Sequence, residues 1–311
     1  KFDAQQLVIQ DVQKLLDEAI VHLSQPFSAN TTVPGGDDVI FGGDPAAWIR
    51  TAWVLKARYA LRLTKRDLNG AVNNALSFLN SAYTAGLTST ANDCIALFDG
   101  SGNAQNQWWA FEQNRGGYMR TNAFFVNLLK AKNDPRLPRF IGTDPAGNFT
   151  GAPMGTNDPA SYSWVGPYFS RNNASLPLVT FEEAKFIEAE AWFRKGDKIK
   201  AAAAYNAAVI ASVEKVTGTA VPAPWKAAEA SETDQTITLE KIMIQKYIAM
   251  FTQPEVWSDW RRTGFPNLIS YANATGGNNI PRRFPIPQSE RINNRNAPAP
   301  VSNVTPVWWD E

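Results

Sequence analysis

The sequence predicts a mainly α-helical protein. Apolar residues recur at helical spacing along several long segments, and almost no segment shows the apolar–polar alternation of a half-buried strand. The chain has 311 residues, of which 44% are hydrophobic and 19% charged, and this balance is typical of a globular protein. A chain of this length can bury a substantial core in one large or two smaller domains.

The first part of the chain predicts a helix, a loop and a helical hairpin. Residues 3–23 carry apolar side chains at helical spacing, and residues 24–43 are rich in Pro, Gly, Thr and Asp, as loops are. Asp44 followed by Pro45 is a typical helix start, because aspartate caps free N–H groups and proline has none to cap. The helix that begins there and a second one after Asp67 each carry one apolar stripe, so the two are expected to pack together.

A second hairpin is predicted near the middle of the chain. Thr180 and Glu183 have the spacing of a capping box, in which each side chain satisfies a backbone N–H of the other residue. A Lys-Gly-Asp turn follows at residues 195–197, and the alanines at 201–204 allow the next helix to approach closely. The two helices together have the length of a tetratricopeptide unit, about 34 residues. Tetratricopeptide-like hairpins forming a right-handed layer are therefore the predicted scaffold, and another helix is expected from Thr238.

Residues 86–175 differ from the rest of the chain. They are rich in Gly, Asn, Asp, Pro and Ser with scattered aromatic residues, and only residues 120–132 show a clear helical pattern. Irregular segments longer than about 15 residues are uncommon in compact domains and are usually functional. We therefore expect residues 86–175 to form a large, irregular ligand-binding insert on the helical scaffold.

Two loop-like stretches of this insert, residues 103–118 and 162–168, combine side chains suited to sugar recognition. Aromatic rings pack against the C–H face of a sugar ring, while amides and guanidinium groups bond its hydroxyls. The alternative is that both adjacent tryptophans plug a core beneath the loops. Because adjacent aromatic residues on a loop normally point different ways, we expect one of the pair to be buried and the other available. The candidate ligand-binding residues are Asn106, Trp108, Trp109, Arg115, Tyr118, Trp164 and Tyr168.

Composition argues against several other functions. Thirty Lys and Arg residues balance 29 Asp and Glu residues, and a net charge of +1 gives no field that would attract nucleic acid. His22 is the only histidine and Cys94 the only cysteine, so zinc sites and His-dependent catalysis have almost no ligands to use. No cofactor and no metal site is predicted, and the chain has no run of about 18 apolar residues that would cross a membrane.

Short motifs in a fixed order resemble those of the SusD/RagB-like outer-membrane proteins. The most distinctive is Arg-Arg-Thr-Gly-Phe-Pro at residues 261–266, which is similar to the RRTG-bearing SusD-like subfamily. The other motifs lie at residues 17–20, 42–44, 55–62, 133–138, 184–191 and 280–284.

The resemblance implies a non-catalytic, surface-exposed lipoprotein of the outer membrane that captures oligosaccharides for a TonB-dependent, SusC-like transporter. Residues 1–311 would form a single SusD-like α domain from which the N-terminal part of the family fold is missing. The lipid-acceptor cysteine of the family lies in that part. We therefore expect membrane attachment only through a lipid anchor that is not present in this chain.

Two other functions remain open. The same scaffold serves oligopeptide uptake in some relatives, and the aromatic side chains suit peptides as well as sugars. A helical glycoside hydrolase would need two carboxylates about 5–9.5 Å apart, and the candidates in the insert are Asp93, Asp99, Glu112 and Asp158. The arginine pairs 261–262 and 282–283 could bind an acidic ligand, although ties to irregular C-terminal backbone are the favoured interpretation.

Overall fold

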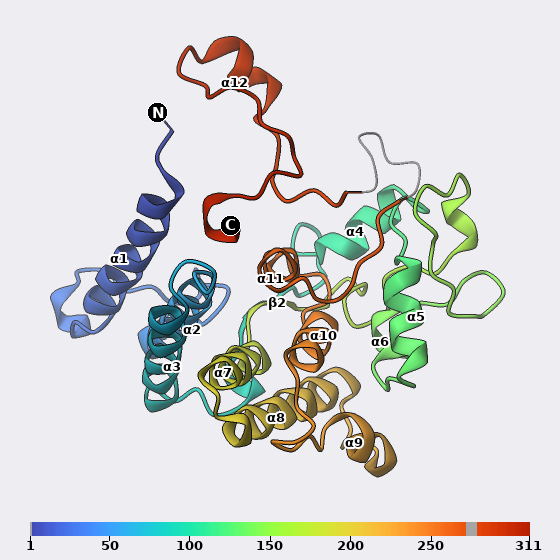
Figure 1. Cartoon of the computed structure of the whole chain (residues 1–311), viewed down its shortest axis with the longest axis horizontal. Helices are drawn as coiled ribbons and strands as arrows, with labels where there is room; N and C mark the ends of the chain where they lie inside the picture. Colours follow the sequence, from blue (N-terminus) through green and yellow to red (C-terminus); the bar gives the residue numbers. More distant parts are fainter. Residues whose placement is uncertain (1, 272–278) are drawn as a thin grey trace.

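The computed structural model describes residues 2–271 and 279–311, which form a mainly helical protein (Figure 1). The predicted fold class is confirmed. The helices are α1 (Gln5–Leu23), α2 (Pro45–Leu61), α3 (Leu68–Thr84), α4 (Gln107–Asn114), α5 (Ala123–Ala131), α6 (Leu137–Phe140), α7 (Phe181–Lys195), α8 (Lys198–Thr217), α9 (Ala223–Glu229), α10 (Leu239–Ala249), α11 (Glu255–Thr263) and α12 (Gln288–Asn293). Two short strands, β1 (Cys94–Ala96) and β2 (Leu176–Val179), pair antiparallel.

Both predicted hairpins are present, as α2–α3 and α7–α8, and α7 also packs against α2, α3 and α10. Their boundaries follow from local signals. The Asp44 carboxylate accepts the Ala46 N–H at 2.9 Å, and Gly196 ends α7 with a φ of 89°. The predicted capping box forms only in part: Thr180 accepts the N–H of Glu183, whose carboxylate instead binds Arg58 in two hydrogen bonds of 2.6 Å.

The hairpins enclose two apolar clusters. One joins α2, α3 and α7 through fully buried side chains such as Leu79 and Ile187. The other joins α7 to α8, α9 and α10 around Phe186 and Tyr205. Most of the alanines at residues 201–204 are buried. Their burial agrees with the predicted close approach of this helix to its neighbour. Together these clusters provide a rigid support for the segments between the hairpins.

The insert is more helical than its composition predicts. The helix expected at residues 120–132 is α5, but α4 and α6 were not expected. A third cluster fixes the insert to the scaffold, with Phe125, Phe140 and Phe169 packed against the end of α10 at Ile248 and Phe251. The insert and the scaffold therefore share this third core.

Most of the C-terminal arginines tie irregular backbone to the helices. Arg262, which is 5% exposed, forms hydrogen bonds of 2.6 Å to Glu190 and 2.7 Å to Asp259. Arg282 donates to both carboxylate oxygens of Asp310, at 2.7 and 2.6 Å. The prediction that these arginines tie backbone carbonyls together is confirmed for Arg282, whose Nη2 also donates to the Arg261 carbonyl. It is wrong for Arg262, whose partners among the described residues are side chains.

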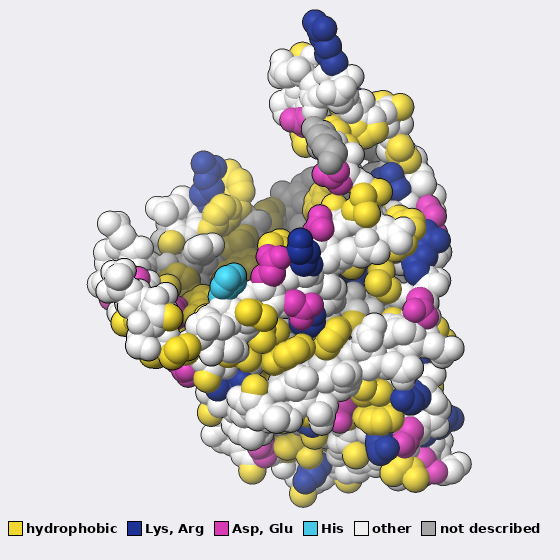
Figure 2. Space-filling view, turned by 90° about the vertical axis from the view of Figure 1, so that its left-hand side faces the viewer, with side chains coloured by type: hydrophobic (Ala, Val, Ile, Leu, Met, Phe, Trp, Pro, Cys, Tyr) yellow, Lys and Arg dark blue, Asp and Glu magenta, His cyan; other side chains and the backbone are white. Residues whose placement is uncertain are grey.

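The surface carries charges of both signs. On the face shown in Figure 2, basic and acidic side chains are interspersed, and the single histidine, His22, lies exposed on α1. Within the described ranges, no helix combines the length and the apolar character needed to cross a bilayer.

Candidate functional site

The tryptophan pair of the insert lies at the start of α4 and not in a loop. Asn106 caps this helix: its Oδ1 accepts the N–H groups of Trp108 at 2.8 Å and Trp109 at 3.2 Å. Its Nδ2 donates to the Ala174 carbonyl at 2.7 Å, and the residue is 1% exposed. Asn106 is therefore a buried helix cap that fixes the start of α4, where the two tryptophans lie. Both tryptophans are half-buried, so the expected division into one buried and one available ring is wrong.

Two cavities, of about 360 and 510 Å³, meet at Trp108. They share Trp108, Met119 and Thr252 in their walls, and we call them together the Trp108 groove. Each is of the size that holds small ligands in proteins. The lining residues are Gln107, Trp108, Phe111, Tyr118, Met119, Arg120, Thr121, Asn122, Phe125, Val165, Leu176, Pro177, Leu178, Tyr247, Phe251, Thr252, Gln253, Pro254 and Val256.

Five of the twelve residues that line the smaller cavity carry aromatic rings. Trp108 comes from α4, Phe125 from α5 and Tyr247 from α10, and the ring of Phe125 stacks on Phe251 with centroids 4.3 Å apart. Arg120 adds a guanidinium that is held by the Pro159 carbonyl at 2.8 Å. Flat rings beside a few fixed polar groups form the kind of surface that a sugar or an extended peptide can occupy.

Thr252 connects the two cavities and has an unusual conformation. Its φ is 75°, in the left-handed region that a β-branched residue rarely adopts. Its buried hydroxyl has no hydrogen-bond partner among the described residues. Strain of this kind costs about 1–3 kcal/mol and concentrates at functional sites. The observed outlier therefore supports a functional role for the corner between α10 and α11.

The sequence candidates separate into two groups. Trp108 and Tyr118 line the groove, and the Arg115 guanidinium lies 5.8 Å from the centroid of the Tyr118 ring, which is 72% exposed. Trp109 and Trp164 are half-buried, and neither lines the groove.

Tyr168 is also outside the lining. Its ring packs edge-on against Phe140 at 5.8 Å and Phe169 at 4.8 Å, and burial raises the pKa of its hydroxyl. Tyr168 therefore belongs to the core of the insert.

Sequence reasoning missed the wall contributed by α5 and by the end of α10. Phe125, Tyr247 and Phe251 occupy helical positions that predict only a core. Pro254 after α10 indicates a turn, but a threonine gives no signal of a positive φ. Only the packing of the insert on α10 brings these residues to α4.

The four candidate acids make structural contacts. Asp93 is 7% exposed and pairs with Lys215 at 2.7 Å, while Glu112 pairs with Arg120 at 3.1 Å. Asp99 accepts the Ser101 N–H at 2.7 Å, and Asp158 accepts the hydroxyl of Ser161. None of the four is among the described residues that line the groove, so its geometry gives the hydrolase alternative no support.

Asp93 gives a testable pH dependence. Burial, and then the neighbouring Glu182 carboxylate, raise the pKa of Asp93 from 3.8 to about 7. The folded state therefore binds the proton of the Asp93 carboxyl more tightly than the unfolded state does. Protonated Asp93 contributes to the free energy of unfolding below about pH 4, and this contribution is lost as the pH rises through about 7. We expect Asp93→Asn to remove that decline, measured by urea unfolding between about pH 5 and about pH 8.

Asp99→Asn is the matched control for this measurement. The hydroxyl and N–H of Ser101 lower the pKa of the exposed Asp99, so its titration is complete below the measured range. Its removal should leave the pH dependence of wild type. Equal slopes for Asp93→Asn and wild type would contradict the raised pKa.

The helical scaffold belongs to a known class of proteins. A family model described as "Starch-binding associating with outer membrane" matches residues 1–287. The chain belongs to this SusD-like family. No curated protein matches the chain.

Solved structures agree with this assignment. A chitin-binding SusD homologue from Flavobacterium johnsoniae is 23% identical with a TM-score of 0.81, over 99% of this chain and 73% of that chain. A SusD homologue from Bacteroides ovatus is 22% identical with a TM-score of 0.81, over 99% and 74% of the two chains. A SusD-like protein from Bacteroides thetaiotaomicron is 25% identical with a TM-score of 0.74, over 94% and 68%. The chain therefore has the SusD fold.

Proposed function

We propose that the protein binds oligosaccharides in the Trp108 groove without cleaving them. The observation that carries this proposal is the position of Trp108, whose side chain borders two adjoining cavities. A ligand longer than one sugar ring could contact the indole from both cavities. Membership of a family described as starch-binding supports a carbohydrate as the ligand.

Oligosaccharides of N-acetylglucosamine are the first ligands that we propose. The Flavobacterium relative is a chitin-binding protein, which supports this choice. The groove supports it independently, because Phe125, Val165 and Val256 give the smaller cavity an apolar wall. The methyl of an acetamido group would bury against such a wall, whereas a sugar with hydroxyls alone would leave it uncovered.

The groove would serve uptake at the cell surface. We propose that the protein is an outer-membrane lipoprotein and delivers its ligand to a TonB-dependent, SusC-like transporter. The family description, which places its members in association with the outer membrane, supports this location. Co-purification of a transporter with the tagged protein from membranes of its host would test the partnership.

A parallel screen of oligosaccharides and oligopeptides tests the ligand class. We expect thermal stabilisation and calorimetric binding with chito-oligosaccharides, and no release of shorter sugars during incubation. Binding of peptides alone would move the protein to the oligopeptide-capturing alternative. Shortening of the bound oligosaccharide would contradict the non-catalytic role.

A further inference from the structure

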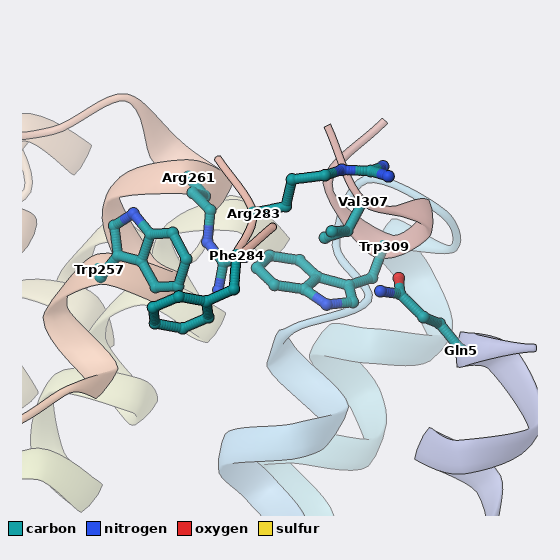
Figure 3. Close-up of a pocket in the computed structure, with 7 residues that line it drawn as sticks. All are labelled: Gln5, Trp257, Arg261, Arg283, Phe284, Val307 and Trp309. Atoms are coloured by element: carbon teal, nitrogen blue, oxygen red, sulfur yellow. The ribbon is translucent and has the colours of Figure 1, made fainter. Parts of the chain in front are cut away.

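A separate cavity of about 340 Å³ lies between α11, the start of α1 and the C-terminal segment. It is lined by the seven residues labelled in Figure 3 and shares none of them with the Trp108 groove. Its floor is fixed, because Ile9 of α1 packs against Val307 and Trp309. The cavity is therefore part of the folded scaffold.

Arg261 is the central polar group of this cavity. Its side chain lies between Trp257 and Trp309 in Figure 3. The guanidinium is 3.7 Å from the ring centroid of Trp257 and 4.4 Å from that of Trp309. Nη1 donates to the Arg282 carbonyl at 2.9 Å, and Nη2 donates to the Ser258 hydroxyl at 3.3 Å. Nε has no partner among the described residues, although the side chain is only 8% exposed.

The neighbouring carboxylates already have other partners. Asp310 pairs with Lys65 and Arg282, and Glu255 pairs with Arg62. Within the described part of the chain, no carboxylate forms an ion pair with Arg261. Burial, and then the charge of Arg62, lower the pKa of Arg261 to about 10, although the charges of Asp310 and Glu255 oppose this shift. A buried cation that lacks a directly paired carboxylate is unfavourable, and an anion would relieve it.

Arg283 supplies a second guanidinium at the same cavity. Its Nε donates to the Thr305 carbonyl at 2.8 Å, and its Nη2 donates to the Pro306 carbonyl. These contacts hold the side chain in place but leave its charge without a carboxylate among residues 2–271 and 279–311. The cavity thus presents two fixed positive charges beside aromatic walls.

The rings suit a ligand with one flat apolar face. Phe284 packs edge-on against Trp257 with centroids 5.0 Å apart, yet it is 81% exposed. In Figure 3 the Gln5 side chain points toward Trp309, where it adds an amide that can bond a hydroxyl. A sugar ring offers both the apolar C–H face and the hydroxyls.

We propose that this cavity binds a carboxylate-bearing sugar such as a hexuronic acid. The carboxylate would pair with the guanidinium of Arg261, the charge of Arg283 would add to the attraction, and the ring would lie against Phe284 and Trp309. A carboxylate supplies the negative charge that Arg261 lacks as a direct ion-pair partner among the described residues, and the cavity volume suits one sugar residue. This site is independent of the oligosaccharide function assigned to the Trp108 groove.

Glucuronate and glucose form a matched pair of ligands, because they differ only in the carboxylate that replaces the terminal CH₂OH. We expect calorimetry on the whole chain to show glucuronate binding at least about tenfold tighter than glucose, as a charge-assisted contact predicts. Added salt should weaken glucuronate binding, because the contact is ionic. Equal affinities for the two sugars, or equal binding of inorganic phosphate, would overturn the proposal.

Variants locate the bound sugar. Phe284→Ala removes an exposed ring and leaves every arginine contact in place, and we expect it to weaken glucuronate binding severalfold or more. Arg283→Gln should weaken binding about tenfold, with thermal unfolding used to verify the fold. Ile199→Ala is the control. It also removes an exposed apolar side chain, but Ile199 does not line this cavity, so the affinity for glucuronate should be unchanged.

Two results would contradict this location. Unchanged glucuronate affinity in both Phe284→Ala and Arg283→Gln would exclude the cavity. Loss of glucuronate binding in Trp108→Ala would assign the sugar to the groove instead. Neither result depends on whether chito-oligosaccharides bind in the Trp108 groove, so the two proposals fail separately.

Discussion

Replacing Trp108 with alanine is expected to weaken oligosaccharide binding by at least tenfold, about 1.4 kcal/mol. Trp108 borders both cavities of the groove, so its loss removes a ring from each of them. Large aromatic side chains at the centre of a binding surface commonly contribute about 2 kcal/mol or more. Isothermal calorimetry with chito-oligosaccharides measures the change directly.

Trp109→Ala is the matched control for this prediction. Trp109 is also half-buried and follows Trp108 on α4, but it does not line the groove. Its replacement should affect stability to a similar extent and affinity much less. An equal loss of affinity in the two variants would show that the effect comes from damage to α4 rather than from loss of a ligand contact.

Replacing Arg262 with methionine is expected to lower the free energy of unfolding by about 3–5 kcal/mol. Glu190 is fully buried and Asp259 is 7% exposed, and Arg262 forms hydrogen bonds to both of them. Glu190 also pairs with Arg194, and Asp259 also pairs with Lys246, each at 2.7 Å. Although burial opposes it, the charge of Arg262 keeps the pKa of Glu190 below its ordinary value. Without Arg262, Glu190 keeps only Arg194 and Asp259 keeps only Lys246, so both buried carboxylates are less well compensated. Urea unfolding at neutral pH measures the loss.

Two comparisons test the cause of that loss. Arg66→Met breaks the more exposed pair with Glu311 and should cost no more than about 1 kcal/mol. Combining Arg262→Met with Glu190→Gln should recover part of the stability, because the excess negative charge left beside Arg194 is gone. If the double variant were less stable than Arg262→Met by the full cost of Glu190→Gln, the buried pair would not explain the effect.

Local signals allowed much of the scaffold to be predicted. Asp44 before Pro45, and Thr180 before an apolar stripe, placed two helix starts correctly, because capping depends only on neighbouring residues. The partner of Glu183 could not be predicted in this way. Arg58 is 125 positions away, and only the packing of α2 against α7 brings the two side chains together.

The candidate site was predicted less completely. Trp108 and Tyr118 were identified from their residue types, but α4 was missed because it is a single short helix of eight residues without a clear apolar period. Thr252 could not be identified at all. Its importance comes from a positive φ and from a place between two cavities, and neither property is encoded in the neighbouring residues.

The most direct test of the proposed function is a crystal structure of the protein with a bound chito-oligosaccharide. We expect sugar rings in the Trp108 groove, with at least one ring against the Trp108 indole and another group near Thr252. Ordered sugar on a different face, with the Trp108 groove empty, would contradict this proposal.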